Sequence, residues 1–251
     1  MRLLNGTPLA EAFLYHGASV FTTLRAEGGR PLWLEEHLAR LRRHALALGL
    51  SYPGDEAFLE DLEALLRAFP KAPCLRLRFT VGEGVRLSEV RPYAPLPLSL
   101  YREGVRVRLT GYRVHPDLAR YKTGNYLPYR LALEEARKEG AFEGLLLDAF
   151  GHVVDGSRTS PLLFREGTLY LLEGGLEGIT REKVAEAARG LGLRVDRGLF
   201  RPEGLRGHLG RRRLGQHAQV PFLEGALVDT LPSSGERARA PARSASPLQP
   251  R

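Results

Sequence analysis

The lysines of this chain are few enough to consider one at a time. There are 33 arginines but only four lysines, at positions 71, 122, 138 and 183. The lysines at 138 and 183 lie in predicted helices, each beside a glutamate, which is typical of a solvated helix face. Lys122 instead ends a linker and precedes a predicted helix, so its amine is a candidate nucleophile toward a carbonyl compound. The alternative is an exposed loop lysine.

Other segments offer a carboxylate and groups that bind phosphate. Asp155 lies in the loop VVDGSRTSPLLF, downstream of the lysine. Ile179 and Thr180 open a predicted helix after Gly178, and free backbone N–H groups at a helix start bind phosphate. Thr180 could instead be only the N-cap of that helix. Arg40 lies within an earlier predicted helix, where its planar guanidinium could hold a phosphate with two hydrogen bonds.

A lysine, a carboxylate and a phosphate cradle are together what pyridoxal phosphate needs. The lysine forms the Schiff base, the acid keeps the pyridine nitrogen protonated, and the cradle holds the phosphate dianion. The sequence therefore predicts a site for this cofactor.

Four segments that would position these groups have apolar residues at spacings of three and four, which indicates amphipathic helices. In the first, Glu35 and Glu36 lie in the first turn and Gly49 follows the end. Pro128 lies in the first turn of the third. The predicted helices are residues 34–48, 55–69, 127–139 and 180–191.

Strand patterns occur between these helices. Apolar residues alternate with arginine over 74–82 and 105–110, which predicts strands with one solvated face. Val20 and Phe21 lead into a further strand that ends at an EGG turn. Strand-like runs also lie on both sides of Phe150 and across LLFREGTLYLL.

Composition narrows the classes that the protein can belong to. Of its 251 residues, 43% are hydrophobic and 26% are charged, with no apolar run long enough to span a membrane. The N-terminus lacks the pattern of a signal peptide, so we expect a cytoplasmic protein with no membrane partner. A single cysteine, Cys74, excludes an internal disulfide and any multi-cysteine metal site, and we predict no metal.

The formal net charge of +8 is concentrated at one end. Residues 206–251 contain eight arginines and three acidic residues, so the rest of the chain is nearly balanced. A basic, non-enzymatic protein that binds nucleic acid is one interpretation. Aromatic residues are not interleaved with these arginines, which favours a solvated segment and no nucleic-acid partner. The final Pro, Ser, Ala and Arg mixture predicts disorder.

The order of five motifs resembles the fold-type IV, class-IV aminotransferase-like family of pyridoxal-phosphate enzymes. The resemblance covers residues 1 to about 208 and departs from the family from Gly210 onward. We therefore hypothesise that residues 210–251 are disordered or follow a shift of the reading frame near residue 209. The motifs are YHGASVFTTLR, RPLWLEEHLARL, KTGNYL, EGLLLDAFGHVVDGSRTS and LEGITR.

The resemblance implies a role for each candidate residue. Lys122 would be the Schiff-base lysine, Arg40 a phosphate ligand and Tyr126 a further cofactor contact. Asp155 stands where the family usually has Glu against the pyridine nitrogen, so the loop must approach more closely or use a water. Ile179 and Thr180 would form the phosphate-binding turn.

The resemblance also implies the fold and the assembly. The fold is α/β, of the D-amino-acid-aminotransferase-like type, with the cofactor between two domains. These are an α+β N-terminal domain over residues 1–113 and an α/β cofactor-binding domain over 122–209, joined by a linker over 114–121. A homodimer that acts on a small-molecule substrate is expected.

Three activities share this scaffold: branched-chain aminotransferase, D-amino-acid aminotransferase and 4-amino-4-deoxychorismate lyase. The pair Thr22-Thr23 after Phe21, the spacing from Lys122 to Asn125 and the short chain favour the lyase, whereas GNYL resembles the branched-chain enzymes. The lyase reaction would give 4-aminobenzoate and pyruvate, with Lys122 as the proton-transfer base.

A hydroxyl could assist the departure of pyruvate in that reaction. Thr23, or else Thr22, would protonate or orient the leaving group. Successive residues of a strand point to opposite faces, so only one of the two threonines can face the site. The alternative is that both are simply good strand formers.

Overall fold

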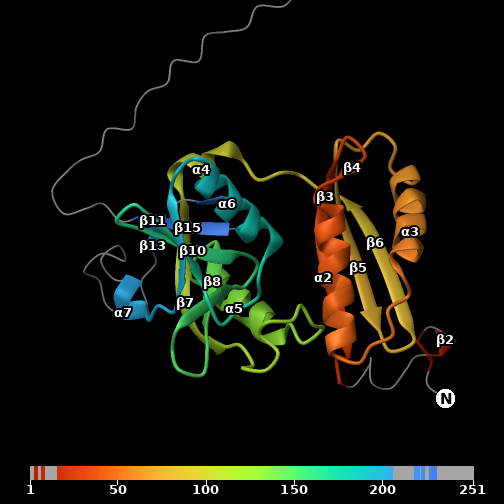
Figure 1. Ribbon diagram of the computed structural model, residues 1–251, viewed down its shortest axis with the longest axis horizontal. Helices are drawn as coiled ribbons and strands as arrows, with labels where there is room; N and C mark the ends of the chain where they lie inside the picture. The colour runs from red at the N-terminus through yellow and green to blue at the C-terminus, as the bar shows by residue number, and fades with distance from the viewer. Residues whose placement is uncertain are drawn as a thin grey trace, which may run out of the picture.

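The structure is a computed structural model that describes residues 3–4, 7–8, 16–205, 218–220, 222–223 and 226–230. The described elements gather into two bodies that lie side by side (Figure 1). Residues 19–92 form one body, and the described residues from 98 onward form the other. The mixture of helices and sheets confirms the predicted α/β class.

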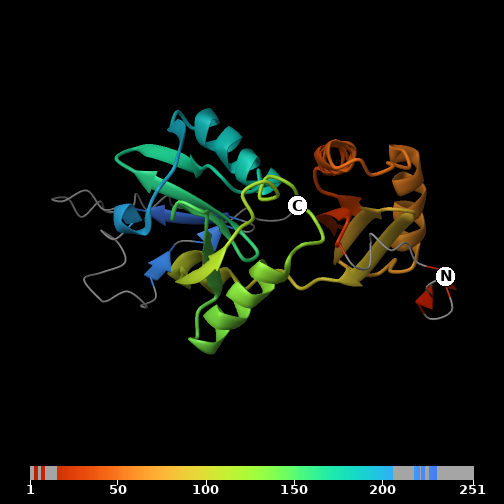
Figure 2. The same ribbon diagram turned by 90° about the horizontal axis from the view of Figure 1, so that it is seen from below.

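The first body is an antiparallel sheet with two helices on one face (Figure 2). Its elements are β3 (Ser19–Glu27), β4 (Arg30–Pro31), α2 (Leu34–Ala47), α3 (Asp55–Arg67), β5 (Cys74–Gly82) and β6 (Val85–Pro92). The strand order is β4-β3-β5-β6, and both helices lie where the apolar spacing predicts them. Before this body, β1 (Leu3–Leu4) pairs with β2 (Thr7–Pro8).

The core of the first body lies between the sheet and the helices. Val20 and Leu24 of β3 belong to the same buried cluster as Leu77 and Phe79 of β5, because every second strand residue points toward the helices. Phe58 of α3 is fully buried in this cluster, with its ring 5.1 Å from that of Phe79. The alternate strand positions face away from the helices, toward the candidate site.

The second body contains two sheets. Its elements up to residue 205 are α4 (Leu98–Glu103), β7 (Val105–Arg113), α5 (Leu127–Lys138), β8 (Glu143–Leu147), β9 (Val153–Gly156), β10 (Ser160–Arg165), β11 (Thr168–Leu172), α6 (Ile179–Gly190), β12 (Arg194–Gly198) and α7 (Pro202–Leu205). Three further strands follow: β13 (Ala218–Val220), β14 (Phe222–Leu223) and β15 (Ala226–Thr230). The strand orders are β13-β7-β8-β9 and β12-β11-β10-β15-β14.

The position of β7 differs from the expected domain division. Its residues fall within the predicted N-terminal domain of 1–113, but β7 pairs in parallel with β8 of the second body. An alternating pattern predicts a strand with one solvated face, and it carries no information about which sheet the strand joins. We therefore propose a boundary between Pro92 and Leu98, and the two domains themselves remain a proposal.

The predicted disordered or frame-shifted segment, residues 210–251, is described only at its three strands. There β13 pairs with β7 and β15 pairs with β10, contrary to the prediction of disorder for these residues. The low-complexity argument rested on the last twenty residues, whereas ALVDT over 226–230 has strand-forming residues. The other residues of this segment lie outside the described ones.

Neither a membrane-spanning helix nor a metal-binding cluster occurs in the described part of the chain. No helix there is long and apolar enough to cross a membrane. No group of three or more His, Cys, Asp or Glu residues there could hold a metal ion.

We predict that Phe58→Ala lowers the free energy of unfolding by about 3–5 kcal/mol, because it removes a fully buried ring and leaves a cavity. Urea unfolding followed by circular dichroism measures the change. Leu59→Ala, one residue along the same helix and partly exposed, is the matched control and is expected to change stability far less. Equal effects of the two substitutions would contradict the assigned core.

Candidate active site

The segment that carries Lys122 lies along β3, on the side of that strand opposite β5. The N–H of Phe21 donates to the carbonyl of Lys122 (2.8 Å), and the N–H of Gly124 donates to the carbonyl of Ser19 (2.8 Å). A Cβ at Gly124 would lie 2.4 Å from Ser19 Oγ, so this approach requires glycine. The lysine backbone is thus attached to the first body, although the helix that follows it belongs to the second.

The side chain of Lys122 lies among aromatic rings. Its Nζ donates to Tyr126 Oη (2.9 Å) and is 4.9 Å from the ring centroid of Phe21. The Tyr126 ring meets Phe21 edge to face at 5.1 Å and stacks on Tyr129 at 4.2 Å. The two residues that the motif KTGNYL places four apart are therefore in direct contact.

The charges around Lys122 favour its neutral amine. Burial lowers the pKa of this amine well below its usual range, and the positive charges of Arg40, Arg78 and Arg76 lower it further. Asp155 acts in the opposite direction. An unprotonated amine is both a nucleophile and a base, which are the two properties that the sequence analysis assigns to Lys122.

Asp155 lies on β9 and is 4% exposed. One carboxylate oxygen accepts the N–H of Gly156 (3.0 Å). Burial raises the pKa of its carboxyl, and the charge of Lys122 opposes that effect. The structure thus brings the predicted lysine and the predicted acid into electrostatic contact, in a buried region where their interaction is little screened.

A second buried carboxyl, Glu143, was not singled out from the sequence. It is fully buried on β8, next to the loop that follows Asp155. Its Oε1 accepts the hydroxyl of Ser157 and the N–H of Gly144, while Arg158 Nε lies 3.9 Å from Oε2. Glu143 therefore fixes the course of the loop that begins at Asp155.

Arg40 lies on α2, facing the sheet. It is 6% exposed, and its Nη2 donates to Thr22 Oγ1 (2.9 Å). Thr22 Oγ1 is also 2.6 Å from His37 Nδ1. Arg40 Nε is buried and has no hydrogen-bond partner among the described residues, so one donor of this guanidinium is unsatisfied.

The two threonines of β3 point in opposite directions, as a strand requires. Thr22 is fully buried under α2. Thr23 lies on the other face, where its register partner on β5 is Arg78. Its Oγ1 is buried and has no partner within the described residues. Of the two candidate hydroxyls, only Thr23 is on the face away from the helices.

The start of α6 faces α2 across the two bodies. Lys183 Nζ lies 2.7 Å from Glu36 Oε1 and connects the two helices. Arg40 is one turn after Glu36, and Ile179 is one turn before Lys183, so both lie next to this contact. The sequence predicted that Lys183 lies on a solvated helix face. The ion pair with Glu36 shows that it instead connects the two bodies, beside the candidate phosphate site.

Thr180 is not the N-cap of α6. The helix begins at Ile179, Gly178 occupies the cap position, and no side chain caps the helix. The N–H groups of the first turn are therefore free of the usual side-chain cap. A Cβ at Gly178 would lie 2.5 Å from Ser160 Oγ, so glycine is required for this turn to pack on β10.

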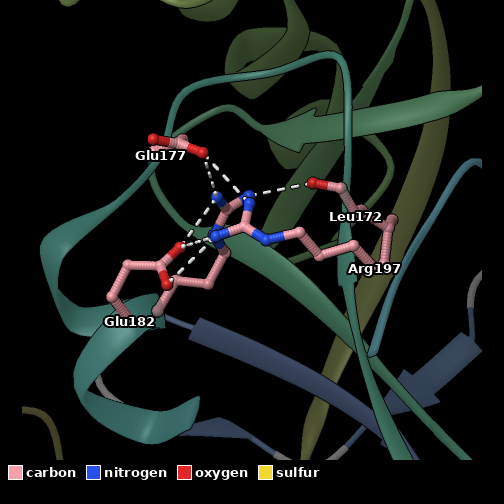
Figure 3. A network of polar contacts seen from close by, with 5 residues as sticks. Leu172, Glu177, Glu182 and Arg197 are labelled. Carbon is pink, nitrogen blue, oxygen red and sulfur yellow. Dashed lines mark hydrogen bonds and ion pairs between the residues drawn. The ribbon is translucent and has the colours of Figure 1, made fainter. Parts of the chain in front are cut away.

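A network of arginines and glutamates holds the turn before α6 (Figure 3). Arg197 of β12 contacts Glu177 at 3.0 Å and Glu182 at 3.3 Å. Arg181, which is 2% exposed, donates to the carbonyl of Leu172 (2.8 Å) and contacts Glu182 at 3.0 Å. The turn that carries Gly178 and Ile179 is thereby attached to both β11 and β12.

These groups fit pyridoxal phosphate. A buried amine with a lowered pKa, a buried acid, an arginine with an unpartnered nitrogen and an uncapped helix start converge where the two bodies meet. An amine, an acid and phosphate-binding groups of these kinds are what a pyridoxal-phosphate enzyme of α/β fold needs. Comparison with known proteins is more specific, because the sequence profile of amino-transferase class IV matches residues 19–217. The chain belongs to the class IV aminotransferase family, whose cofactor is pyridoxal phosphate.

Relatives with two different activities are similar to this chain. The aminodeoxychorismate lyase of Bacillus subtilis is 30% identical over 220 residues, which are 79% of this chain and 74% of that protein. A probable branched-chain-amino-acid aminotransferase of Rickettsia conorii is 27% identical over 199 residues, covering 72% and 68%.

Solved structures of proteins named for the same two activities are also similar to this chain. One that is provisionally described as a 4-amino-4-deoxychorismate lyase is 97% identical, with a TM-score of 0.77, covering 82% of this chain and 86% of its own. The branched-chain aminotransferase of Thermoproteus uzoniensis, solved with norvaline, is 26% identical, with a TM-score of 0.72 and coverage of 90% and 83%. A further branched-chain enzyme, 28% identical, is complexed with N-(5'-phosphopyridoxyl)-L-glutamate. These likenesses confirm the predicted fold-type IV fold.

The predicted site residues thus lie around one place, and their roles remain predictions. Lys122 contacts Tyr126 and interacts with Asp155 and Arg40. Residues that sequence reasoning missed were hidden by common patterns: Arg76 and Arg78 belong to an ordinary alternating strand, and His37 and His44 to an amphipathic helix.

In the cofactor-free protein, we predict that an amine-acylating reagent labels Lys122 at lower pH than the exposed Lys138. Because the pKa of the Lys122 amine is lowered, its reactivity is present above that lowered value and is lost only as the pH falls through it. Mass spectrometry of the labelled peptides across a pH series measures both lysines in one sample. Identical pH dependence for the two lysines would contradict the electrostatic environment described here.

Proposed function

We propose that the protein is a 4-amino-4-deoxychorismate lyase, which converts its substrate to 4-aminobenzoate and pyruvate. The observation that carries the proposal is the unpartnered Thr23 hydroxyl, which lies on the same sheet face as Phe21, the residue whose ring is 4.9 Å from the amine of Lys122. The similarity to the Bacillus subtilis lyase and to the 97% identical structure supports it.

Residues from both bodies hold the cofactor in this proposal. Arg40 and the backbone N–H groups of Ile179 and Thr180 bind the phosphate, and Asp155 pairs with the ring nitrogen. Tyr126 positions the ring beside Lys122. When bound, pyridoxal phosphate withdraws electrons from the substrate carbon that bears the amine.

Lys122 and Thr23 perform the proton transfers. Lys122 Nζ takes the proton from the carbon that bears the amine, and its lowered pKa favours the unprotonated form that this step needs. The bond between the neighbouring ring carbon and the ether oxygen then breaks, and the ring becomes aromatic. Thr23 Oγ1 donates a hydrogen bond to that oxygen, and pyruvate is released after protonation of its enol form.

The two substrate carboxylates need cations, and Arg76 and Arg78 are our candidates for this role. Arg76 and Arg78 lie on β5 opposite Arg25 and Thr23 of β3, and both lower the pKa of the Lys122 amine. The Arg78 guanidinium carbon is 3.7 Å from the ring centroid of Phe21. We assign the carboxylates of the substrate to these two side chains.

Transamination of branched-chain or D-amino acids is the second candidate. The branched-chain relatives and the GNYL motif favour it. In that reaction Lys122 would move the proton between two atoms of the same substrate, and a 2-oxo acid would be the second substrate. The chemistry of a lyase requires no such acceptor.

We predict that the protein loaded with pyridoxal phosphate releases pyruvate from 4-amino-4-deoxychorismate with no amino acceptor present. Lys122→Ala abolishes the release, because it removes the amine that takes the proton. Coupled lactate dehydrogenase detects the pyruvate. If pyruvate formed only after a 2-oxo acid was added, or if an amino acid was transaminated instead, the lyase proposal would be wrong.

Thr23→Val should lower the turnover number of the lyase by about 10²–10⁴-fold, since it removes the hydroxyl that assists the leaving oxygen. Thr23→Ser keeps the hydroxyl and should retain most of the activity. Steady-state kinetics of both variants, with cofactor content measured in each, provides the comparison. Equal activity of the Val and Ser variants would exclude Thr23 from the chemistry.

A homodimer and a cytoplasmic location follow only from the resemblance and from the sequence, and both are part of this proposal. Analytical ultracentrifugation measures the first, and a monomer at enzyme-assay concentration would contradict it. Resequencing the gene around residue 209 tests the proposed frame shift.

A further inference from the structure

His44 is buried in the last turn of α2, with only 5% of its surface exposed. Its Nδ1 accepts the backbone N–H of Lys122 at 3.1 Å, although the two residues are 78 apart in the chain. The imidazole also meets the ring of Tyr121 edge to face at 5.4 Å. The helix therefore reaches the segment of the reactive lysine through one side-chain acceptor.

Both backbone polar groups of Lys122 are bound by the first body. The carbonyl accepts the N–H of Phe21 on β3, and the N–H donates to His44 on α2. Two hydrogen bonds from two different elements leave this residue little freedom to rotate or shift. The amine at the end of the side chain can then keep its place beside Tyr126.

The hydrogen bond also defines the state of the imidazole. Because the donor is an amide N–H, Nδ1 must carry a lone pair, and the ring is the neutral Nε2–H tautomer. The charged groups that act on it are Arg40 and Arg43 of the same helix and Lys122 of the facing segment. Burial and these positive charges lower the pKa of His44 to about 4, so Nδ1 remains an acceptor at neutral pH.

We propose that His44 is a positioning residue for Lys122. Its Nδ1 holds the lysine backbone in the register that presents the amine to Tyr126 and Asp155, and this inference rests on Lys122 being the reactive amine of the proposed function. The side chain of His44 touches neither substrate nor cofactor in this proposal. It acts through the backbone of the lysine.

Two substitutions separate this role from plain packing. His44→Asn places a carbonyl oxygen near the position of Nδ1 and keeps an acceptor, although it removes much of the ring. His44→Phe keeps a ring of similar size and removes the acceptor, which leaves a buried N–H unpaired. If His44 only fills space, His44→Phe should disturb the Lys122 segment less than His44→Asn. If His44 positions the lysine, His44→Asn should disturb it less.

The first measurement is amide hydrogen exchange at Lys122 in the cofactor-free protein, followed by NMR. We expect exchange at this amide to become about tenfold faster, or more, in His44→Phe and to stay near the original rate in His44→Asn. His115→Phe, in an exposed loop, is the control and should leave the Lys122 amide unchanged. Equal exchange in the Phe variant and the original protein would overturn the proposal.

The second measurement is the rate at which borohydride traps pyridoxal phosphate on Lys122, identified by the mass of the labelled peptide. We expect trapping to be about tenfold slower in His44→Phe than in His44→Asn at equal cofactor concentration. A greater loss in the Asn variant, in proportion to a loss of unfolding free energy, would show that His44 acts only by packing.

The experiments on His44 can fail or succeed independently of the lyase assay. If the protein released no pyruvate from the lyase substrate, but exchange and trapping at Lys122 still followed the acceptor at position 44, the lyase assignment would fail and the positioning role would stand. If pyruvate were released and both variants trapped cofactor equally, the positioning role would fail alone.

Discussion

The pairing of the Lys122 segment with β3 is the constraint on which the rest of the site depends. It places the backbone of Lys122 on the first body, while its amine meets Tyr126 of the second body as well as Phe21 of the first. The environment of the amine is therefore created only when both bodies are in place. Arg40, Arg76 and Arg78 of the first body lower the pKa of the Lys122 amine, and Asp155 of the second body acts in the opposite direction.

Helix α2 carries polar groups on a face that would ordinarily be apolar. His37, Arg40 and His44 are buried beside Leu38 and Leu41. Buried polar groups cost free energy unless they are hydrogen-bonded, and two of these three bind Thr22 while the third binds the lysine segment. Helix α2 thus packs in the core of the first body and also holds the side chains and the lysine segment of the site in place.

The sequence predicted those parts of the molecule that local patterns determine. The helices over residues 34–48 and 127–139 follow from apolar spacing, and Lys122 was found because lysine is rare and its neighbours form a linker. The fold and the identity of the cofactor depended on the order of five motifs, since no single spacing defines them. The sequence showed that only one of Thr22 and Thr23 can face the site. It could not show which one, because packing decides which face of the strand turns toward the helices.

What the sequence could not predict are contacts between residues far apart in the chain. The parallel pairing of β7 with β8, the bond from the lysine backbone to His44, and the contact of Lys183 with Glu36 join segments that show ordinary patterns by themselves. Glu143 was overlooked for the same reason, since an acid at the start of an apolar strand looks like a surface residue until the loop beyond it folds back.

The contact between α2 and α6 has a thermodynamic consequence. Arg40 belongs to one body and the uncapped start of α6 to the other, so an anion bound between them contacts both. Such a ligand would need both bodies in this arrangement, so its binding free energy would be coupled to their alignment. The phosphate of the cofactor would then stabilise the relative position of the two bodies as well as hold the cofactor. Formation of the active enzyme would depend on whether the cofactor binds before or after the two bodies come together.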